Sequence, residues 1–146
     1  MHSAFHPVIE AMQRSLEWRR DDTSADRLAK LERMIAVAQL PLPEVVPLFA
    51  GLLSLPIPDN RYPRRGLAPA ELKQQTFEAL VTWILAESEQ RPVFAVWEDL
   101  HWADPSTLDL LDLLIVQTPA VRMLTLLTAR LEFQSHWRSS SALTHI

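Results

Sequence analysis

The sequence predicts an α/β fold, in which a helical N-terminal part is followed by a strand, a helix and a second, parallel strand. Three observations support this. Apolar residues recur at helical spacing through the first half of the 146-residue chain. The continuous apolar run 93–97 is typical of a parallel strand that is buried on both faces, and a second apolar run follows at 123–127. Between these runs, Asp104-Pro105 has the residue types of a helix start.

The N-terminal helices are predicted from their apolar stripes and caps. The first stripe consists of Val8, Ile9, Met12 and Leu16. Within the acidic stretch 21–26, Thr23 or Ser24 is expected to cap a second helix that continues to about Gln39. Pro43 suits the first turn of a third helix, where a missing N–H costs nothing. Helical structure is therefore expected up to about residue 55.

A proline-rich segment separates this region from the rest of the chain. Residues 56–69 hold too many prolines for a helix or a sheet and predict an irregular connection. A long helix is expected to begin at Pro69 and to end before Arg91-Pro92. The predicted organisation is thus a helical segment 1–55, a connection 56–69, a helix with a strand–helix–strand unit 70–133, and a disordered tail 134–146.

Polar side chains follow both predicted strands. Glu98 and Asp99 come directly after the first strand, and Thr128 and Arg130 after the second. Parallel strands place their carboxyl ends on one edge, where ligands of open α/β sheets bind. One carboxylate would then hold a divalent cation, the other would orient or deprotonate a water, and the arginine would bind a phosphate. Alternatively, the acids lie in a solvated turn and Arg130 pairs with one of them.

Composition excludes several functional classes. The two glycines, Gly51 and Gly66, form neither GxGxxG nor GxxxxGK[ST], and the absence of cysteine excludes disulfides, thiolate nucleophiles and cysteine-bound zinc. A net charge of −4 without a clustered basic face argues against nucleic-acid partners, and Arg19-Arg20 is expected to be solvated. No signal peptide or membrane-spanning run is present, so a cytoplasmic location without membrane partners is expected.

Residues 91–111, RPVFAVWEDLHWADPSTLDLL, resemble the Walker B region of STAND-class, AAA+-like ATPases that accompany class III adenylate or guanylate cyclases and LuxR-type regulators. The resemblance extends to 126–130, LLTAR, which is similar to the sensor strand of that family, and back to 4–9 and 52–56. It implies a partial P-loop NTPase fold of the ASCE/AAA type. It also implies ATP and Mg²⁺ as cofactors and a role in signal transduction.

The resemblance assigns a role to each polar residue at the sheet edge. Glu98 matches the metal-directed Walker B acid and Asp99 the catalytic acid that polarises water. Arg130 matches the residue that contacts the γ-phosphate, with Thr128 beside it as a further nucleotide-binding position.

The departures from the family pattern carry expectations of their own. The family has its phosphate-binding loop and two core strands before the region that matches Ala4, and the chain holds no Walker A lysine. Trp97 and Leu131 stand where a small aliphatic residue and a proline are usual. We therefore expect an internal ATPase fragment that binds ATP poorly and is inactive alone. Its expected partners are the missing N-terminal half, a cyclase or regulator domain, or a second copy that pairs with an exposed sheet edge.

Two further functions compete with this hypothesis. One is a noncatalytic protein-interaction module derived from such an ATPase. The other is a metal-dependent hydrolase that uses His101 with Glu98, Asp99 and Asp104, although these residues have no recognised ligand spacing. For Asp104 a helix cap is the simpler expectation, and His101-Trp102 is expected to pack the loop.

Overall fold

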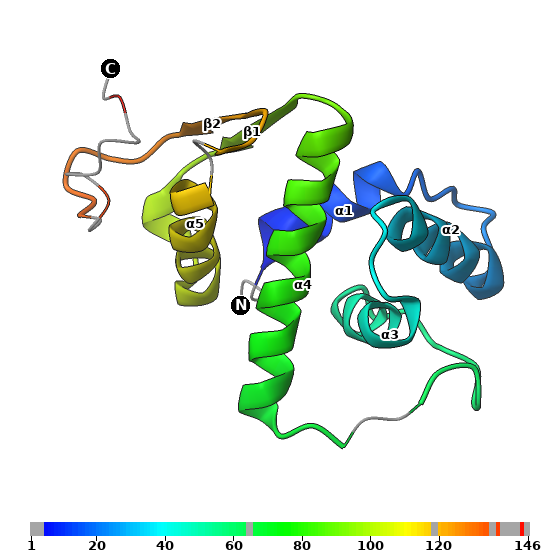
Figure 1. Cartoon of the computed structure of the whole chain (residues 1–146). Helices are drawn as coiled ribbons and strands as arrows, with labels where there is room; N and C mark the ends of the chain where they lie inside the picture. Colours follow the sequence, from blue (N-terminus) through cyan, green and yellow to red (C-terminus); the bar gives the residue numbers. More distant parts are fainter. Residues whose placement is uncertain (1–4, 64–65, 118–119, 135–136, 138–143, 145–146) are drawn as a thin grey trace. The chain divides into compact units, whose positions relative to one another are not determined.

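The computed structural model describes residues 5–63, 66–117, 120–134, 137 and 144 (Figure 1). Its elements in chain order are α1 (His6–Ser15), α2 (Ser24–Val37), α3 (Leu42–Leu52), α4 (Pro69–Gln90), β1 (Val93–Trp97), the 3₁₀ turn η1 (Leu100–Trp102), α5 (Pro105–Gln117) and β2 (Met123–Leu127). The chain divides into two compact units, one of residues Val8–Ala86 and one of Met1–Pro7 with Glu87–Ile146. One boundary falls within α1 and the other within α4.

Helix starts in the first unit follow their predicted caps. The Thr23 hydroxyl accepts a hydrogen bond from the Asp26 N–H (3.1 Å), and the Asp26 carboxylate accepts one from the Thr23 N–H (2.9 Å). This reciprocal pair is a capping box, which satisfies two N–H groups that helix geometry leaves without a partner. Pro43 lies in the first turn of α3, and α4 begins at Pro69, as the sequence predicts.

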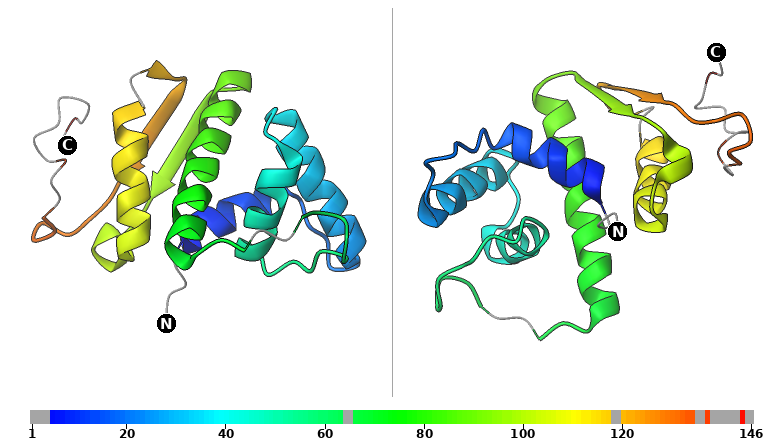
Figure 2. Two further views of the ribbon diagram at one scale, coloured as in Figure 1. Left: turned by 60° about the horizontal axis from the view of Figure 1, so that its bottom comes forward. Right: turned by 180° about the vertical axis from the view of Figure 1, so that it is seen from behind.

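The core of the first unit is formed by the inward stripes of its helices. The α2 helix packs on α3 (Figure 2), and Phe49 of α3 meets Trp83 of α4 edge to face, with ring centroids 6.3 Å apart. Such pairs add to the stability that apolar burial provides. The most completely buried side chains here are Met12, Leu31, Ile35, Val46, Phe49 and Leu80.

Glu32 links the proline-rich segment to α2. Its carboxylate accepts hydrogen bonds from Arg61 Nε (2.8 Å) and Nη2 (2.7 Å) and from the Tyr62 hydroxyl (2.6 Å). Burial works to raise the pKa of Glu32, but the hydrogen bonds from Arg61 and Tyr62 outweigh it and hold the pKa below its ordinary value. An irregular segment is thereby fixed to a helix by side chains about 30 positions apart.

Glu32→Gln is expected to lower the unfolding free energy near neutral pH by the modest amount typical of a partly exposed ion pair. Because folding lowers the pKa of Glu32, its contribution is complete above the unfolded pKa and is lost as the pH falls through the folded pKa. Urea unfolding curves of the two proteins should therefore converge in acid. Glu78→Gln, on the exposed side of α4, is the matched control, and a difference that persists in acid would contradict the prediction.

The second unit contains the predicted strand–helix–strand arrangement. Strands β1 and β2 are parallel, from the pair Val93 and Met123 to the pair Trp97 and Leu127. Both strands have the predicted bounds, and α5 begins at Pro105 and lies on one side of the strand pair (Figure 2). Within the described part of the chain the sheet has these two strands. The α/β prediction is thus confirmed at this level.

The expectation that these strands are buried on both faces is wrong. Phe94 and Leu124 pair with each other and are 63% and 68% exposed, and the next same-face pair, Val96 and Leu126, is also exposed. Side chains alternate between faces along a strand, so these four residues form one face. An apolar run makes burial on both faces of a strand favourable, but burial also requires another element that packs over each face. In the described chain no element covers this face.

The C-terminal residues contribute a described contact to the second unit. The tail predicted to be disordered, 134–146, falls mostly outside the described residues. Trp137, which is described, is buried and donates its Nε1 hydrogen to the Asp112 carboxylate of α5.

Among the described residues, every helix is too short or too polar to traverse a lipid bilayer.

Candidate functional site

The candidate site is the edge at which β1 and β2 end. Trp97 and Leu127 are the last paired residues, so the chain leaves both strands at the same end. Glu98 and Asp99 follow one strand, and Thr128 and Arg130 follow the other. The parallel pairing thereby brings the four predicted residues to one edge of the sheet, where ligands of α/β folds bind.

Thr128 holds the two strand exits together. Its N–H donates to the Trp97 carbonyl (2.9 Å), and its own carbonyl accepts from the Leu100 N–H (2.9 Å). Its hydroxyl accepts a hydrogen bond from the Asp99 N–H (3.1 Å). These three hydrogen bonds continue the contact between the two chain segments past the last paired residues of the sheet. They fix the backbone on both sides of the acidic pair relative to Thr128.

Asp99 adopts an unusual backbone conformation. Its φ is 55° and its ψ 44°, in the left-handed region that non-glycine residues rarely occupy, although aspartate tolerates it better than most. The hydrogen bond from its N–H to Thr128 and the start of η1 at the next residue hold this conformation. Strained residues of this kind concentrate at functional sites.

Both carboxylates are exposed and, within the described chain, neither forms an ion pair with Arg130. The alternative, in which Arg130 pairs with one of the acids, is therefore not seen among the described side chains. Carboxylate oxygens in this state can accept hydrogen bonds from water or coordinate a cation.

Arg130 is placed by an aromatic side chain. Its guanidinium carbon lies 5.6 Å from the ring centroid of Trp102, which is 68% exposed. Trp102 in turn contacts the His101 ring at a centroid distance of 5.3 Å. Stacking on an indole restricts a guanidinium while leaving its N–H donors free to bind an oxyanion.

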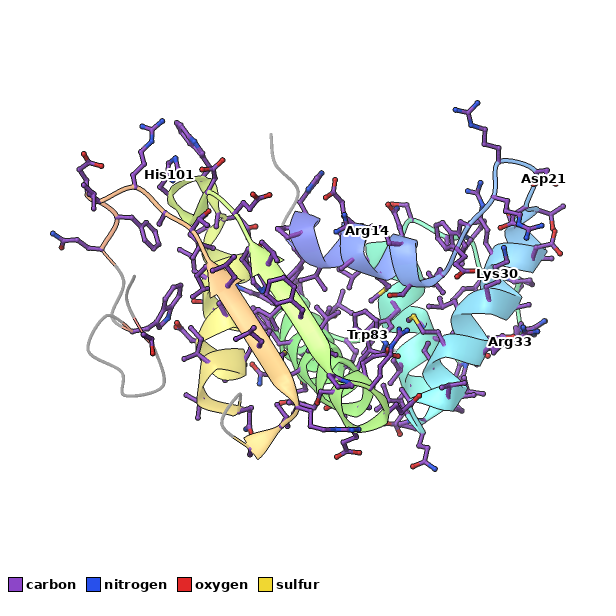
Figure 3. The ribbon with its side chains drawn as sticks, turned by 90° about the horizontal axis from the view of Figure 1, so that it is seen from above. Arg14, Asp21, Lys30, Arg33, Trp83 and His101 are labelled. Carbon is purple, nitrogen blue, oxygen red and sulfur yellow. The ribbon has the colours of Figure 1, made fainter. Side chains whose placement is uncertain are left out.

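Sequence reasoning missed this role of Trp102. The sequence predicts only that His101-Trp102 packs the loop, and it does not indicate the 3₁₀ turn that carries the dipeptide. Its one sequence signal is its position close to the two acids, from which Leu100 separates it. His101, labelled in Figure 3, has a buried Nδ1 that finds no hydrogen-bond partner among the described residues.

Asp104 has the capping role that the sequence predicts. Its carboxylate accepts hydrogen bonds from the Thr107 N–H (3.0 Å) and the Thr107 hydroxyl (2.5 Å) at the start of α5. This carboxylate is engaged in the helix start, whereas Glu98 and Asp99 are not.

The donor set at the edge suits a hard cation that is shared with a ligand. In the described ranges, no three histidine or acidic side chains gather into a metal-binding group. Mg²⁺ commonly uses only one or two carboxylates and completes its coordination with phosphates and waters, so Glu98 and Asp99 fit such a cation. A metal held by protein ligands alone would need more donors.

The chain was compared with family models, with curated proteins and with solved structures, and none of the three comparisons returned a match.

Proposed function

We propose that the edge beyond β1 and β2 is the magnesium–nucleotide edge of a P-loop-type ATPase module that serves in signal transduction. The observation that supports this most directly is the parallel pairing, which brings Glu98 and Asp99 together with Thr128 and Arg130 while the acids remain free of Arg130. The resemblance of residues 91–111 and 126–130 to the Walker B and sensor regions agrees with this placement.

Each residue has a distinct role in this proposal. Glu98 is the metal-directed acid, and bound Mg²⁺ would neutralise charge on the phosphate oxygens. Asp99 orients the attacking water, a task for which the hydrogen bond from its N–H to Thr128 gives it a defined position. Arg130, stacked on Trp102, binds the terminal phosphate with its planar donors.

The 146 residues lack one part of such a site, the phosphate-binding loop. Most phosphate affinity in P-loop sites comes from backbone N–H groups of a glycine-rich loop and from its lysine. Neither is present in this sequence. A further segment or chain must provide them, and these residues alone should bind ATP weakly and hydrolyse none.

A second candidate function is a noncatalytic interaction module. One observation favours it, namely the exposed apolar face formed by Phe94, Val96, Leu124 and Leu126. Contiguous exposed apolar surface of this kind marks interaction sites on soluble proteins. The two functions are compatible, because this face and the polar edge involve different residues.

The proposed function can be tested on the chain as it stands with Mn²⁺, which replaces Mg²⁺ and broadens nearby NMR signals even at low occupancy. In the presence of ATP, Mn²⁺ is expected to broaden the amide signals of Glu98, Asp99 and Thr128 selectively. Glu98→Gln should abolish this broadening because it removes a charged ligand. Asp109→Asn, an exposed acid of α5, should leave it intact.

Two outcomes would contradict the proposal. One is broadening of equal strength at Asp21 and Asp22, two acids far from the edge in sequence. The other is edge broadening that survives Glu98→Gln. Either result would mean that the cation samples surface acids in general, and the edge would then be a solvated turn.

A further inference from the structure

Four arginines surround one depression in the first unit. Arg14 comes from α1, Arg19 and Arg20 from the connection that follows, and Arg27 from α2. Trp18 forms part of the same wall, and the depression has a volume of about 620 Å³. The structure thus gathers a local basic cluster on a chain whose net charge is −4.

Trp18 and Arg27 lie against each other within this depression. The Arg27 guanidinium carbon is 5.2 Å from the Trp18 ring centroid. Trp18 Nε1 and Arg27 Nε are both buried hydrogen-bond donors, and neither has an acceptor among the described residues. Both atoms are closed to solvent, so a ligand in the depression would meet the terminal N–H groups of Arg27 rather than these two donors.

The charge on the wall indicates what kind of acceptor fits. Glu10 and Glu17 are the two carboxylates of the lining, which leaves the four arginines with an excess of two positive charges. Asp22, close by in sequence, is already used. It accepts hydrogen bonds from Lys30 Nζ (2.6 Å) and the Arg19 N–H (2.8 Å), which lower its pKa. A compact dianion would balance the remaining charge.

We propose that this depression binds the phosphate group of a phosphate monoester, with the guanidinium groups of Arg14, Arg19, Arg20 and Arg27 as its donors and Trp18 in its wall. A phosphate monoester carries a charge of about −1.5 to −2 at neutral pH and three strong acceptor oxygens. Guanidinium groups match its geometry with two parallel hydrogen bonds.

The proposal does not depend on the function assigned to the β1–β2 edge, because it involves other residues of the other unit. In the sequence, Arg19-Arg20 is an ordinary exposed pair and does not indicate the cluster. The site arises only when α1 and α2 bring Arg14 and Arg27 to it.

The experiment is a titration of the whole chain with inorganic phosphate at constant ionic strength, monitored by the indole N–H signals of the five tryptophans. Trp18→Phe identifies the Trp18 signal. We expect this signal to move with a saturating, millimolar dependence, while the signal of Trp83, which is buried and does not line the depression, does not move. The affinity should fall as the pH is lowered below about 6, where the dianion is protonated.

Variants test the named donors. Arg27→Gln should weaken binding by about tenfold or more, the loss expected for one charge-assisted hydrogen bond. Arg20→Gln should weaken it severalfold while leaving the contact between Trp18 and Arg27 in place, so it remains informative if the first variant perturbs folding. The matched control is Arg33→Gln, on α2 outside the depression (Figure 3), which should bind phosphate as the parent does.

Two further ligands identify the source of the phosphate. Tighter binding of adenosine 5′-monophosphate indicates a metabolite, and tighter binding of a phosphoserine tripeptide indicates a modified protein segment. Three results would overturn the proposal. These are an unmoved Trp18 signal, an equal loss of affinity in Arg33→Gln, and an oligonucleotide of phosphodiesters that binds more tightly than any monoester.

Discussion

Asparagine at position 99 is expected to reduce ATP hydrolysis by roughly 10²- to 10⁴-fold once the chain is joined to a segment that carries a phosphate-binding loop. Asp99 orients or deprotonates the attacking water in the proposed function, and asparagine keeps the size of the side chain but removes its charge. Nucleotide binding should be largely retained, because this carboxylate makes little contact with the bound ground state. Hydrolysis and binding are measured separately, by phosphate release and by calorimetry.

Two further substitutions show whether the effect belongs to Asp99. Glu98→Gln should instead raise the Mg²⁺ concentration that hydrolysis requires, since it removes the metal-directed charge. Asp104→Asn should change neither property, because Asp104 caps α5 and asparagine is an equally good cap. If all three variants showed the same mild loss, the two acids following β1 would have no specific role.

Replacing Phe94 and Leu124 together by threonine is expected to raise the concentration at which the chain self-associates by at least about tenfold. These paired residues are the most exposed of the four that form the apolar sheet face. Within the described chain, β2 is paired only with β1, so backbone groups on its other side can also pair with a second copy. Threonine is a good strand residue and should preserve the pairing of β1 with β2.

Light scattering during size-exclusion chromatography, at several concentrations, measures this association, and hydrogen exchange at 123–127 reports on the strand. Leu131→Thr is the control, because Leu131 is 89% exposed but lies outside the sheet. A parent chain that stays monomeric, with strongly protected amides in both strands, would contradict the prediction. It would show that the two-stranded sheet is stable without a further strand.

Much of the secondary structure could be predicted from local patterns. The start of α2 follows from Thr23 and Asp26, which cap it across only three positions. The start of α5 follows in the same way from Asp104 and Thr107. The bounds of β1 and β2 follow from two apolar runs, one of which begins after Pro92, and both of which are followed by polar residues. These signals depend on interactions within about one helical turn or one strand.

The candidate site was predictable only in part. The parallel arrangement places Glu98 and Asp99 on one edge with Thr128, as the topology of a strand–helix–strand unit requires. The left-handed conformation of Asp99 and the stacking of Arg130 on Trp102 could not be read from the sequence. Both depend on how two segments about 30 residues apart meet in space.

Local sequence patterns account for most helix and strand bounds and for the polar residues that follow the strands. Which apolar residues are covered depends on the folded chain, since Phe94 and Ala95 belong to the same run but differ in exposure. Only in the folded chain do Arg14 and Arg27 join Arg19 and Arg20 around one depression. Helix caps and apolar periodicity depend on residues that are close together in the sequence. Burial and charge clustering instead depend on contacts between segments that are far apart in the sequence.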